Sequence, residues 1–129
     1  MLIVDTSVWI ETFRKTDPLD LEALVDFDSI VTCLPVIQEV LQGFRNESAF
    51  RTAREAMLNL PVVDDPLERD VVESAVDLYR TARHRGITVR SSIDCLVAAS
   101  AIRHDLEILH RDRDYPLLAR VSGLRQRAI

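Results

Sequence analysis

The sequence predicts an α/β fold in which helices cover a parallel sheet. Short apolar runs rich in β-branched side chains alternate with longer stretches of helical periodicity, which is the pattern of strands joined by crossover helices. The first run, Leu2–Val4, holds no polar residue, as expected of a strand that is buried on both faces. With 47% hydrophobic and 29% charged residues, the composition is that of an ordinary globular protein. We expect the 129 residues to form one domain, residues 1–129, with a substantial core.

The first half of the chain is predicted to alternate between strands and helices. Asp5 ends the first strand, and Thr6 and Ser7 can cap the helix that follows. Pro35 suits the first turn of a later helix, in which Glu39 falls at the edge of the apolar stripe. In chain order we expect a strand over residues 2–4, a helix from Thr6, a short helix over residues 19–27, a strand over residues 30–32, a helix near Pro35, a helix over residues 47–58 and a strand over residues 61–63.

A long amphipathic helix is predicted next. Asp65, Pro66 and Glu68 occupy the cap, first-turn and capping-box positions, and Gly86 is a natural end. Cations in its last turns complement the helix dipole, but they could equally form a strip that contacts phosphates. The residues of this strip are Arg80, Arg83, Arg85 and, just beyond the helix, Arg90.

The stretch from Cys95 to Ile102 carries no charge, which predicts a central helix buried on nearly every side. Ser91 and Asp94 fit a capping box at its start, and this would be a sufficient structural reason for the aspartate. A strand over residues 107–109, a short helix over residues 116–120 and an edge strand or tail over residues 121–129 complete the predicted elements.

Charge and cysteine usage narrow the function classes. A net charge of −5 is unusual for a nucleic-acid binder, so it points to a small-molecule enzyme or to an acidic site that needs cations. Cys33 and Cys95 are isolated and the histidines are scattered, which argues against a zinc site. No apolar run reaches about 18 residues, and Asp5 precedes any possible signal-peptide core. We therefore expect a soluble, cytosolic protein without a membrane segment.

Acidic residues are the candidates for a site at the carboxyl edge of the sheet. Asp5 and Asp112 follow predicted strands, whereas Glu39 and Asp94 lie in the early turns of predicted helices. Ligands collect at this edge in open α/β sheets. Each residue also has an ordinary explanation, such as a helix cap for Asp5 or a surface position for Glu39.

Convergence of these carboxylates would require cations. Two carboxylates about 5 Å apart repel by roughly 3 kcal/mol at an effective dielectric of 20, and we expect no lysine to compensate them, because Lys15 is the only one in the chain. Oxygen ligands without histidine or cysteine select hard cations such as Mg²⁺ or Mn²⁺. The reaction class that fits such a site is metal-assisted phosphodiester hydrolysis.

Four short motifs occur along the chain in a fixed order. They are Ile3–Trp9, Pro35 with Glu39 and Val40, Ile93–Ala99, and Leu109–Tyr115. Together they resemble the motifs of the PIN-domain ribonucleases, and the resemblance covers essentially the whole chain. The compact size, without an extra domain, resembles the VapC toxins, which are the ribonuclease halves of bacterial toxin–antitoxin pairs.

This resemblance implies an α/β/α sandwich, Mg²⁺ or Mn²⁺ dependence, and RNA cleavage by a metal-activated water. Thr6 matches the hydroxyl residue beside the first aspartate, where it would hydrogen-bond a ligand or water. Tyr115 stands where the family often has phenylalanine, and its ring is expected to pack on the sheet. By motif position, the metal ligands are Asp5 and Asp94 first, then Glu39 directly or through water, then Asp112, with Asp114 as an accessory ligand.

The resemblance also implies partners: a homodimer, an RNA substrate, and a VapB antitoxin that inserts beside the acidic groove. Candidates for contact with RNA or antitoxin are Arg80, Arg83, Arg85 and Arg90. One alternative is a PIN-like module that no longer cleaves and acts through partner binding alone. A haloacid-dehalogenase-like phosphatase or a receiver domain fits worse. The phosphatase would have an aspartate at position 7, where this chain has Ser7, and the receiver domain would have an early acidic pair. Both classes need a late lysine that the chain lacks.

Overall fold

The computed structural model describes all 129 residues and contains one parallel sheet. The strands run in the order β3–β2–β1–β4–β5, and every pairing is parallel. Their bounds are β1 Leu2–Val4, β2 Ile30–Cys33, β3 Val62–Val63, β4 Glu107–His110 and β5 Arg125–Ala128. The predicted α/β class is therefore confirmed, including an edge strand at the carboxyl end of the chain.

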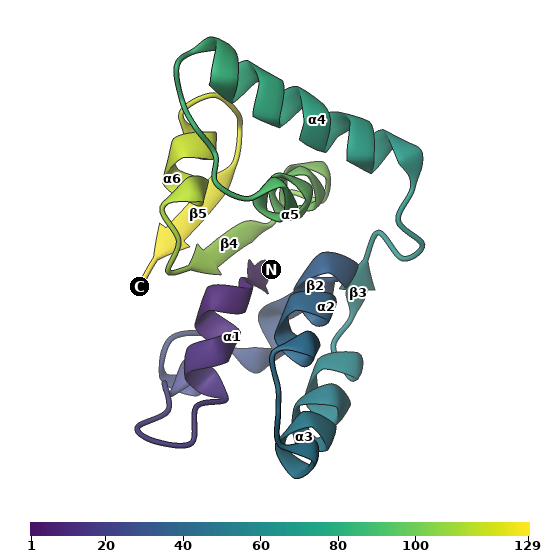
Figure 1. Cartoon of the computed structure of the whole chain (residues 1–129), viewed down its shortest axis with the longest axis vertical. Coiled ribbons are helices and arrows are strands. Elements are labelled where there is room, and N and C mark those ends of the chain that lie inside the picture. Colours follow the sequence, from purple (N-terminus) through teal and green to yellow (C-terminus); the bar gives the residue numbers. More distant parts are fainter.

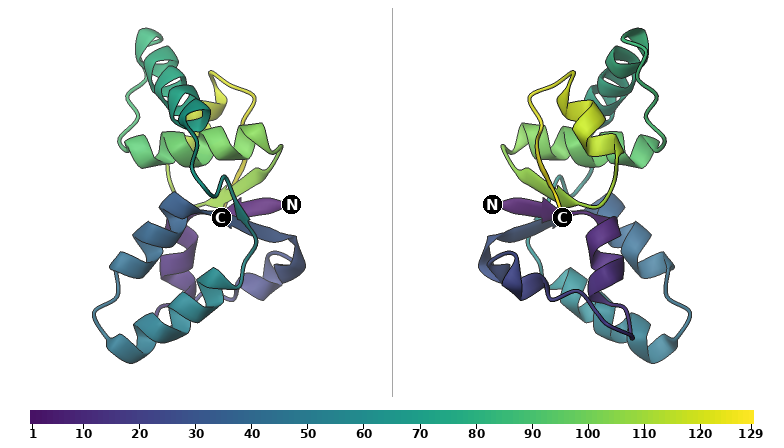
Figure 2. Two further views of the ribbon diagram at one scale, coloured as in Figure 1. Left: turned by 90° about the vertical axis from the view of Figure 1, so that its right-hand side faces the viewer. Right: turned by 90° about the vertical axis from the view of Figure 1, so that its left-hand side faces the viewer.

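Helices cover both faces of this sheet, as the labelled view in Figure 1 and the two side views in Figure 2 show. One layer holds α1 Thr6–Thr12, α2 Leu34–Gln42 and α3 Glu47–Leu58, and the other holds α4 Arg69–His84, α5 Ser92–Arg103 and α6 Asp114–Ala119. This is the α/β/α sandwich that the resemblance implied. No helix has the length and apolar character needed to cross a membrane.

The core is centred on β1 and α5. Ile3 and Val4 in β1 are fully buried, as are Ile108 and Leu109 in the adjacent strand β4. Val4 is in register with Leu109, one residue before the end of β4, so the two strands deliver the residues that follow them to one edge. The uncharged helix α5 is buried along most of its length, as its composition predicted, because small side chains let it pack closely on its neighbours.

One predicted helix is wrong, and two others begin at different residues than predicted: α4, described below, and α6, which starts at Asp114 and not at residue 116. Residues 19–27 do not form a helix: the segment contains a 3₁₀ turn at Leu21–Ala23, and a second turn follows at Phe27–Ser29. The Asp26 carboxylate accepts the Asp28 N–H at 3.0 Å, a local bond that favours a turn over a helix.

Helix α4 begins at Arg69, with Glu68 as its cap residue, and not at Asp65 and Pro66. The chain turns at Asp64, which has a φ of 53°. The Asp64 carboxylate pairs with Arg103 and His104 at the end of α5. These contacts hold the preceding segment against α5, so the helix starts later than the sequence pattern suggested.

Candidate metal centre

The candidate acidic residues reach one edge of the sheet from five different segments. Asp5 follows β1 and Asp112 follows β4, while Glu39 projects from α2. Asp94 lies in the first turn of α5, and Asp114 is the first residue of α6. One carboxylate oxygen from each of Asp94, Asp112 and Asp114 lies within 4.8 Å of the others. Asp5 and Glu39 border this group, as the contacts below show.

Asp5 is both a helix cap and a member of the acidic cluster. Its Oδ2 accepts the Ser7 backbone N–H at 3.0 Å and the Ser7 hydroxyl at 2.6 Å, which caps α1. Its Oδ1 accepts the Tyr115 hydroxyl at 2.6 Å. The Ser7 Oγ also accepts the Arg111 backbone N–H at 3.0 Å, which ties the cap to the loop after β4. Asp5 therefore caps α1 and also lies in the acidic cluster, so the two explanations do not exclude each other.

Asp94 is buried without adequate hydrogen-bond partners. Only 5% of the residue is exposed, and its Oδ2 has no partner. Burial raises the pKa of Asp94 to about 9, and the neighbouring Asp114, Asp112 and Asp5 add to this increase. The predicted capping box is wrong, because neither Ser91 nor Asp94 caps α5 with its side chain.

Asp114 performs the capping that the sequence assigned to Asp94. Both of its carboxylate oxygens accept the Arg90 N–H at 3.1 Å, and Oδ2 also accepts the Ser91 N–H at 3.1 Å. The first residue of α6 thus holds the start of α5. With 1% exposure, Asp114 is a buried clamp between two segments far apart in sequence.

Replacement of Asp114 by alanine should lower the free energy of unfolding by about 2 kcal/mol, because it leaves the part-buried backbone N–H groups of Arg90 and Ser91 without a charged acceptor. Asp114→Asn keeps one acceptor oxygen and should lose less. Urea denaturation of the metal-free protein measures both effects, with the exposed Asp77→Asn as the control. Unchanged stability of Asp114→Ala would show that the clamp contributes nothing.

Glu39 is half-buried and held by Thr6, whose hydroxyl donates to Glu39 Oε1 at 3.0 Å. Burial raises the pKa of Glu39, although the Thr6 hydrogen bond opposes this, and the negative charges of Asp5 and Asp112 raise it further. Thr6 therefore contacts a protein carboxylate and orients it toward the other acids.

Asp112 is positioned by a hydrogen-bonded chain that starts at the edge strand. His110 Nε2 lies 2.7 Å from Gln126 Oε1, and His110 Nδ1 accepts the Asp112 N–H at 3.0 Å. The ring proton therefore lies on Nε2, because Nδ1 is an acceptor. Asp112 Oδ1 in turn accepts the Asp114 N–H at 2.9 Å. Strand β5 thus fixes the loop that carries two of the acids.

The donor set fits a hard divalent cation. Every candidate ligand atom is a carboxylate oxygen, the type that Mg²⁺ and Mn²⁺ prefer. None of these five acids forms an ion pair with an arginine, lysine or histidine. The partnerless Oδ2 of Asp94 is a buried acceptor that a cation would satisfy.

Comparison with known proteins decides the family. The PIN-domain profile matches residues 2–124. The chain is 37% identical to ribonuclease VapC11 of Mycobacterium tuberculosis over 131 aligned positions, which cover 96% of each chain. The chain belongs to the PIN-domain family, in its VapC ribonuclease branch. The VapC ribonuclease Mb1587 of Mycobacterium bovis matches equally, with 37% identity over 96% of each chain.

The fold of this VapC-family chain also matches a solved structure. The VapBC of Salmonella typhimurium, crystallised with bound DNA, has a chain that superposes with a TM-score of 0.78 at 17% identity. The match covers 99% of this chain and 98% of that one. The two share the fold over their whole lengths.

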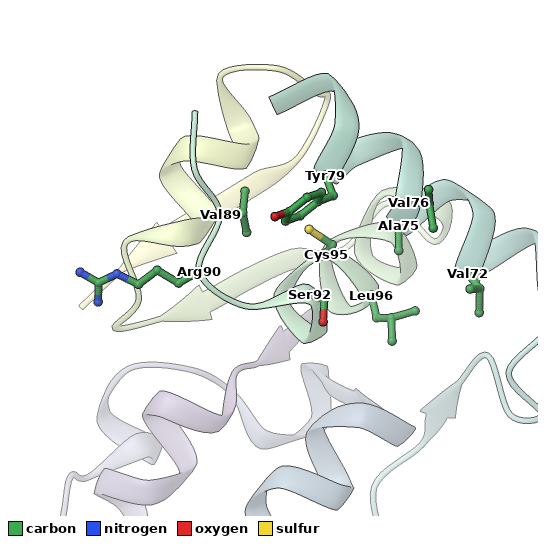
Figure 3. A pocket seen from close by; sticks show the side chains of 9 residues that line it. All are labelled: Val72, Ala75, Val76, Tyr79, Val89, Arg90, Ser92, Cys95 and Leu96. Atoms are coloured by element: carbon green, nitrogen blue, oxygen red, sulfur yellow. The ribbon is translucent and has the colours of Figure 1, made fainter. Parts of the chain in front are cut away.

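The arginine strip of this VapC-family chain stays on the surface. Arg80, Arg83, Arg85 and Arg90 are all exposed. Arg90 also borders an apolar pocket between α4 and α5, and its side chain points away from that pocket (Figure 3). Only its backbone N–H reaches the acidic cluster, through Asp114. The structure therefore brings the predicted acids together but leaves the arginines outside that cluster.

Sequence reasoning missed the contacts of Tyr115 and His110. The ring of Tyr115 is fully buried, as expected, but its hydroxyl reaches two of the acids. Burial and the charges of Asp5 and Asp94 raise the pKa of Tyr115 well above its usual value, so the phenol keeps its proton. The available signal was the hydroxyl itself, at a position where the VapC family often has phenylalanine.

Proposed function

We propose that the protein is a toxin endoribonuclease that hydrolyses RNA phosphodiester bonds with Mg²⁺ or Mn²⁺. The observation that carries this proposal is the buried carboxylate of Asp94, which lies among other acids and pairs with no basic side chain. The similarity to VapC ribonucleases supplies the reaction class. Asp5 and Asp94 are the principal metal ligands in this proposal.

The remaining acids have separate roles. Glu39, oriented by Thr6, ligates directly or through water and helps to orient the attacking water. Asp112 is a further ligand. Asp114 mainly holds the backbone of α5, and its remaining lone pairs make it an accessory ligand. When bound, a divalent cation at such a site clamps the phosphodiester, lowers the pKa of water and neutralises the leaving oxygen.

Partners follow from the same family membership. Relatives of this fold were solved as VapBC pairs, so we propose that a VapB-like antitoxin neutralises this protein in the cytoplasm. The arginine strip is available to contact RNA or antitoxin phosphates and carboxylates. We further propose a homodimer, for which exposed Val72 and Val76 beside the α4–α5 pocket offer an apolar surface.

The test is cleavage of a mixed tRNA and rRNA pool by the purified protein. Discrete fragments should form with Mg²⁺ or Mn²⁺ and disappear with EDTA. They should also disappear in a preparation of Asp5→Asn, which controls for contaminating nuclease. An Asp5→Asn preparation that cleaves as well as the wild type would contradict the proposal. No cleavage by any preparation would favour a module that acts by partner binding alone.

Divalent cations should also stabilise the folded protein. Mn²⁺ at about 100 times its dissociation constant adds about 2.7 kcal/mol, which raises the melting temperature by several degrees. Asp5→Asn should reduce this gain and, by removing charge repulsion, can stabilise the metal-free protein. Differential scanning calorimetry measures both. Identical Mn²⁺ responses of wild type and Asp5→Asn would mean that Asp5 is not a ligand.

A further inference from the structure

Tyr115 is the residue whose side chain contacts both principal acids. Its hydroxyl oxygen lies 2.6 Å from Asp5 Oδ1 and 3.3 Å from Asp94 Oδ1. The ring is fully buried and packs on His110, with 5.0 Å between ring centroids. Packing therefore fixes where the hydroxyl lies, independently of the two carboxylates.

The hydroxyl completes the hydrogen bonding of Asp5. Ser7 holds one oxygen of this carboxylate with two donors, and Tyr115 is the hydrogen-bond donor to the other. A phenol has a single proton to donate, and the shorter distance assigns it to Asp5. Asp94 Oδ1 faces the same phenol oxygen at the longer distance. One buried atom thus sets the orientation of Asp5 and its spacing from Asp94.

We propose that Tyr115 is a positioning residue that presents Asp5 and Asp94 at the spacing a divalent cation requires. This inference rests on the metal site of the proposed function. Hydrogen-bond partners that orient metal ligands typically change metal affinity by about 10–100-fold. Phenylalanine would keep the ring and its packing on His110, so Tyr115→Phe isolates the contribution of the hydroxyl.

Isothermal titration of Mn²⁺ into wild type, Tyr115→Phe and Tyr79→Phe tests the proposal. Tyr79 is the only other tyrosine and lies in α4, where it lines an apolar pocket that none of the five acids lines. We expect Tyr115→Phe to bind Mn²⁺ about 10–100-fold more weakly and Tyr79→Phe to bind as the wild type does. Equal affinity of folded Tyr115→Phe and wild type overturns the inference. Absence of Mn²⁺ binding by the wild type instead overturns the proposed metal site, and the inference with it.

A spectroscopic readout separates positioning from a merely structural role and does not require Tyr115→Phe to fold. In Tyr79→Phe the single remaining tyrosine is Tyr115. The tyrosine Fermi doublet in ultraviolet resonance Raman spectra reports the hydrogen bonding of its hydroxyl. Saturation with Mg²⁺ should change the intensity ratio of this doublet, because the cation draws charge from the Asp5 carboxylate that accepts the bond. An unchanged ratio at proven Mg²⁺ saturation overturns the inference.

Discussion

Replacement of Asp94 by asparagine should reduce metal-dependent RNA cleavage by more than about 100-fold, since even the outer partners of metal ligands contribute 10–100-fold. Asparagine has nearly the same shape but no charge to attract a cation. The fold should persist, because Asp94 makes no capping bond to α5. Initial cleavage rates at saturating Mg²⁺, together with growth of cells that express the variant, measure the effect.

The matched control for Asp94→Asn is Asp77→Asn, an equally conservative change at an exposed position of α4. It should cleave RNA and inhibit growth as the wild type does. Growth inhibition that persists undiminished in Asp94→Asn would contradict the ribonuclease mechanism. The toxic effect would then have to come from partner binding.

The stability of the metal-free protein should fall as the pH rises from about 4 toward 9. The pKa of Asp94 is raised from 3.8 to about 9 in the fold, so the folded state keeps a proton that the unfolded chain releases near pH 4. Stability decreases with pH wherever the folded state binds more protons. One such group gives a slope of at most about 1.4 kcal/mol per pH unit. The raised pKa of Glu39 acts in the same direction.

Urea denaturation between pH 6 and 8 in EDTA would measure this slope, and Asp94→Asn should flatten it. Saturating Mg²⁺ should abolish this slope, because cation binding displaces the Asp94 proton, and the folded and unfolded chains then bind equal numbers of protons. Asp77→Asn should keep the wild-type slope. If Asp94→Asn shows the same slope of stability against pH as the wild type, Asp94 is not the buried acid that causes this slope.

Local patterns in the sequence predict most of this fold. The apolar run of β1 and the uncharged stretch of α5 indicate burial directly, and the helix over residues 47–58 has the predicted bounds. The start of α4 was not predictable in this way. It depends on the pairing of Asp64 with Arg103 and His104, a contact across about 40 residues that no local pattern contains.

In the candidate site, too, some features follow from local sequence patterns and others depend on contacts between residues distant in sequence. Motif order predicts Asp5, Glu39, Asp94 and Asp112, and the structure brings these acids to one edge of the sheet. The roles of Asp114 and Tyr115 depend instead on partners distant in sequence. Asp114 meets the Arg90 backbone 24 residues away, and Tyr115 meets Asp5 at a separation of 110 residues. A capping box at Ser91 was the local alternative, and the tertiary contact of Asp114 replaces it.

Anomalous diffraction from crystals grown with Mn²⁺ tests most directly whether the acidic edge of the sheet binds a divalent cation. We predict a Mn²⁺ peak in contact with carboxylate oxygens of Asp5 and Asp94, at about 2.1 Å, the distance typical of small hard divalent cations. The peak should be absent from crystals of Asp94→Asn. A fully occupied Mn²⁺ peak elsewhere on the chain, with none at this edge, would contradict the account.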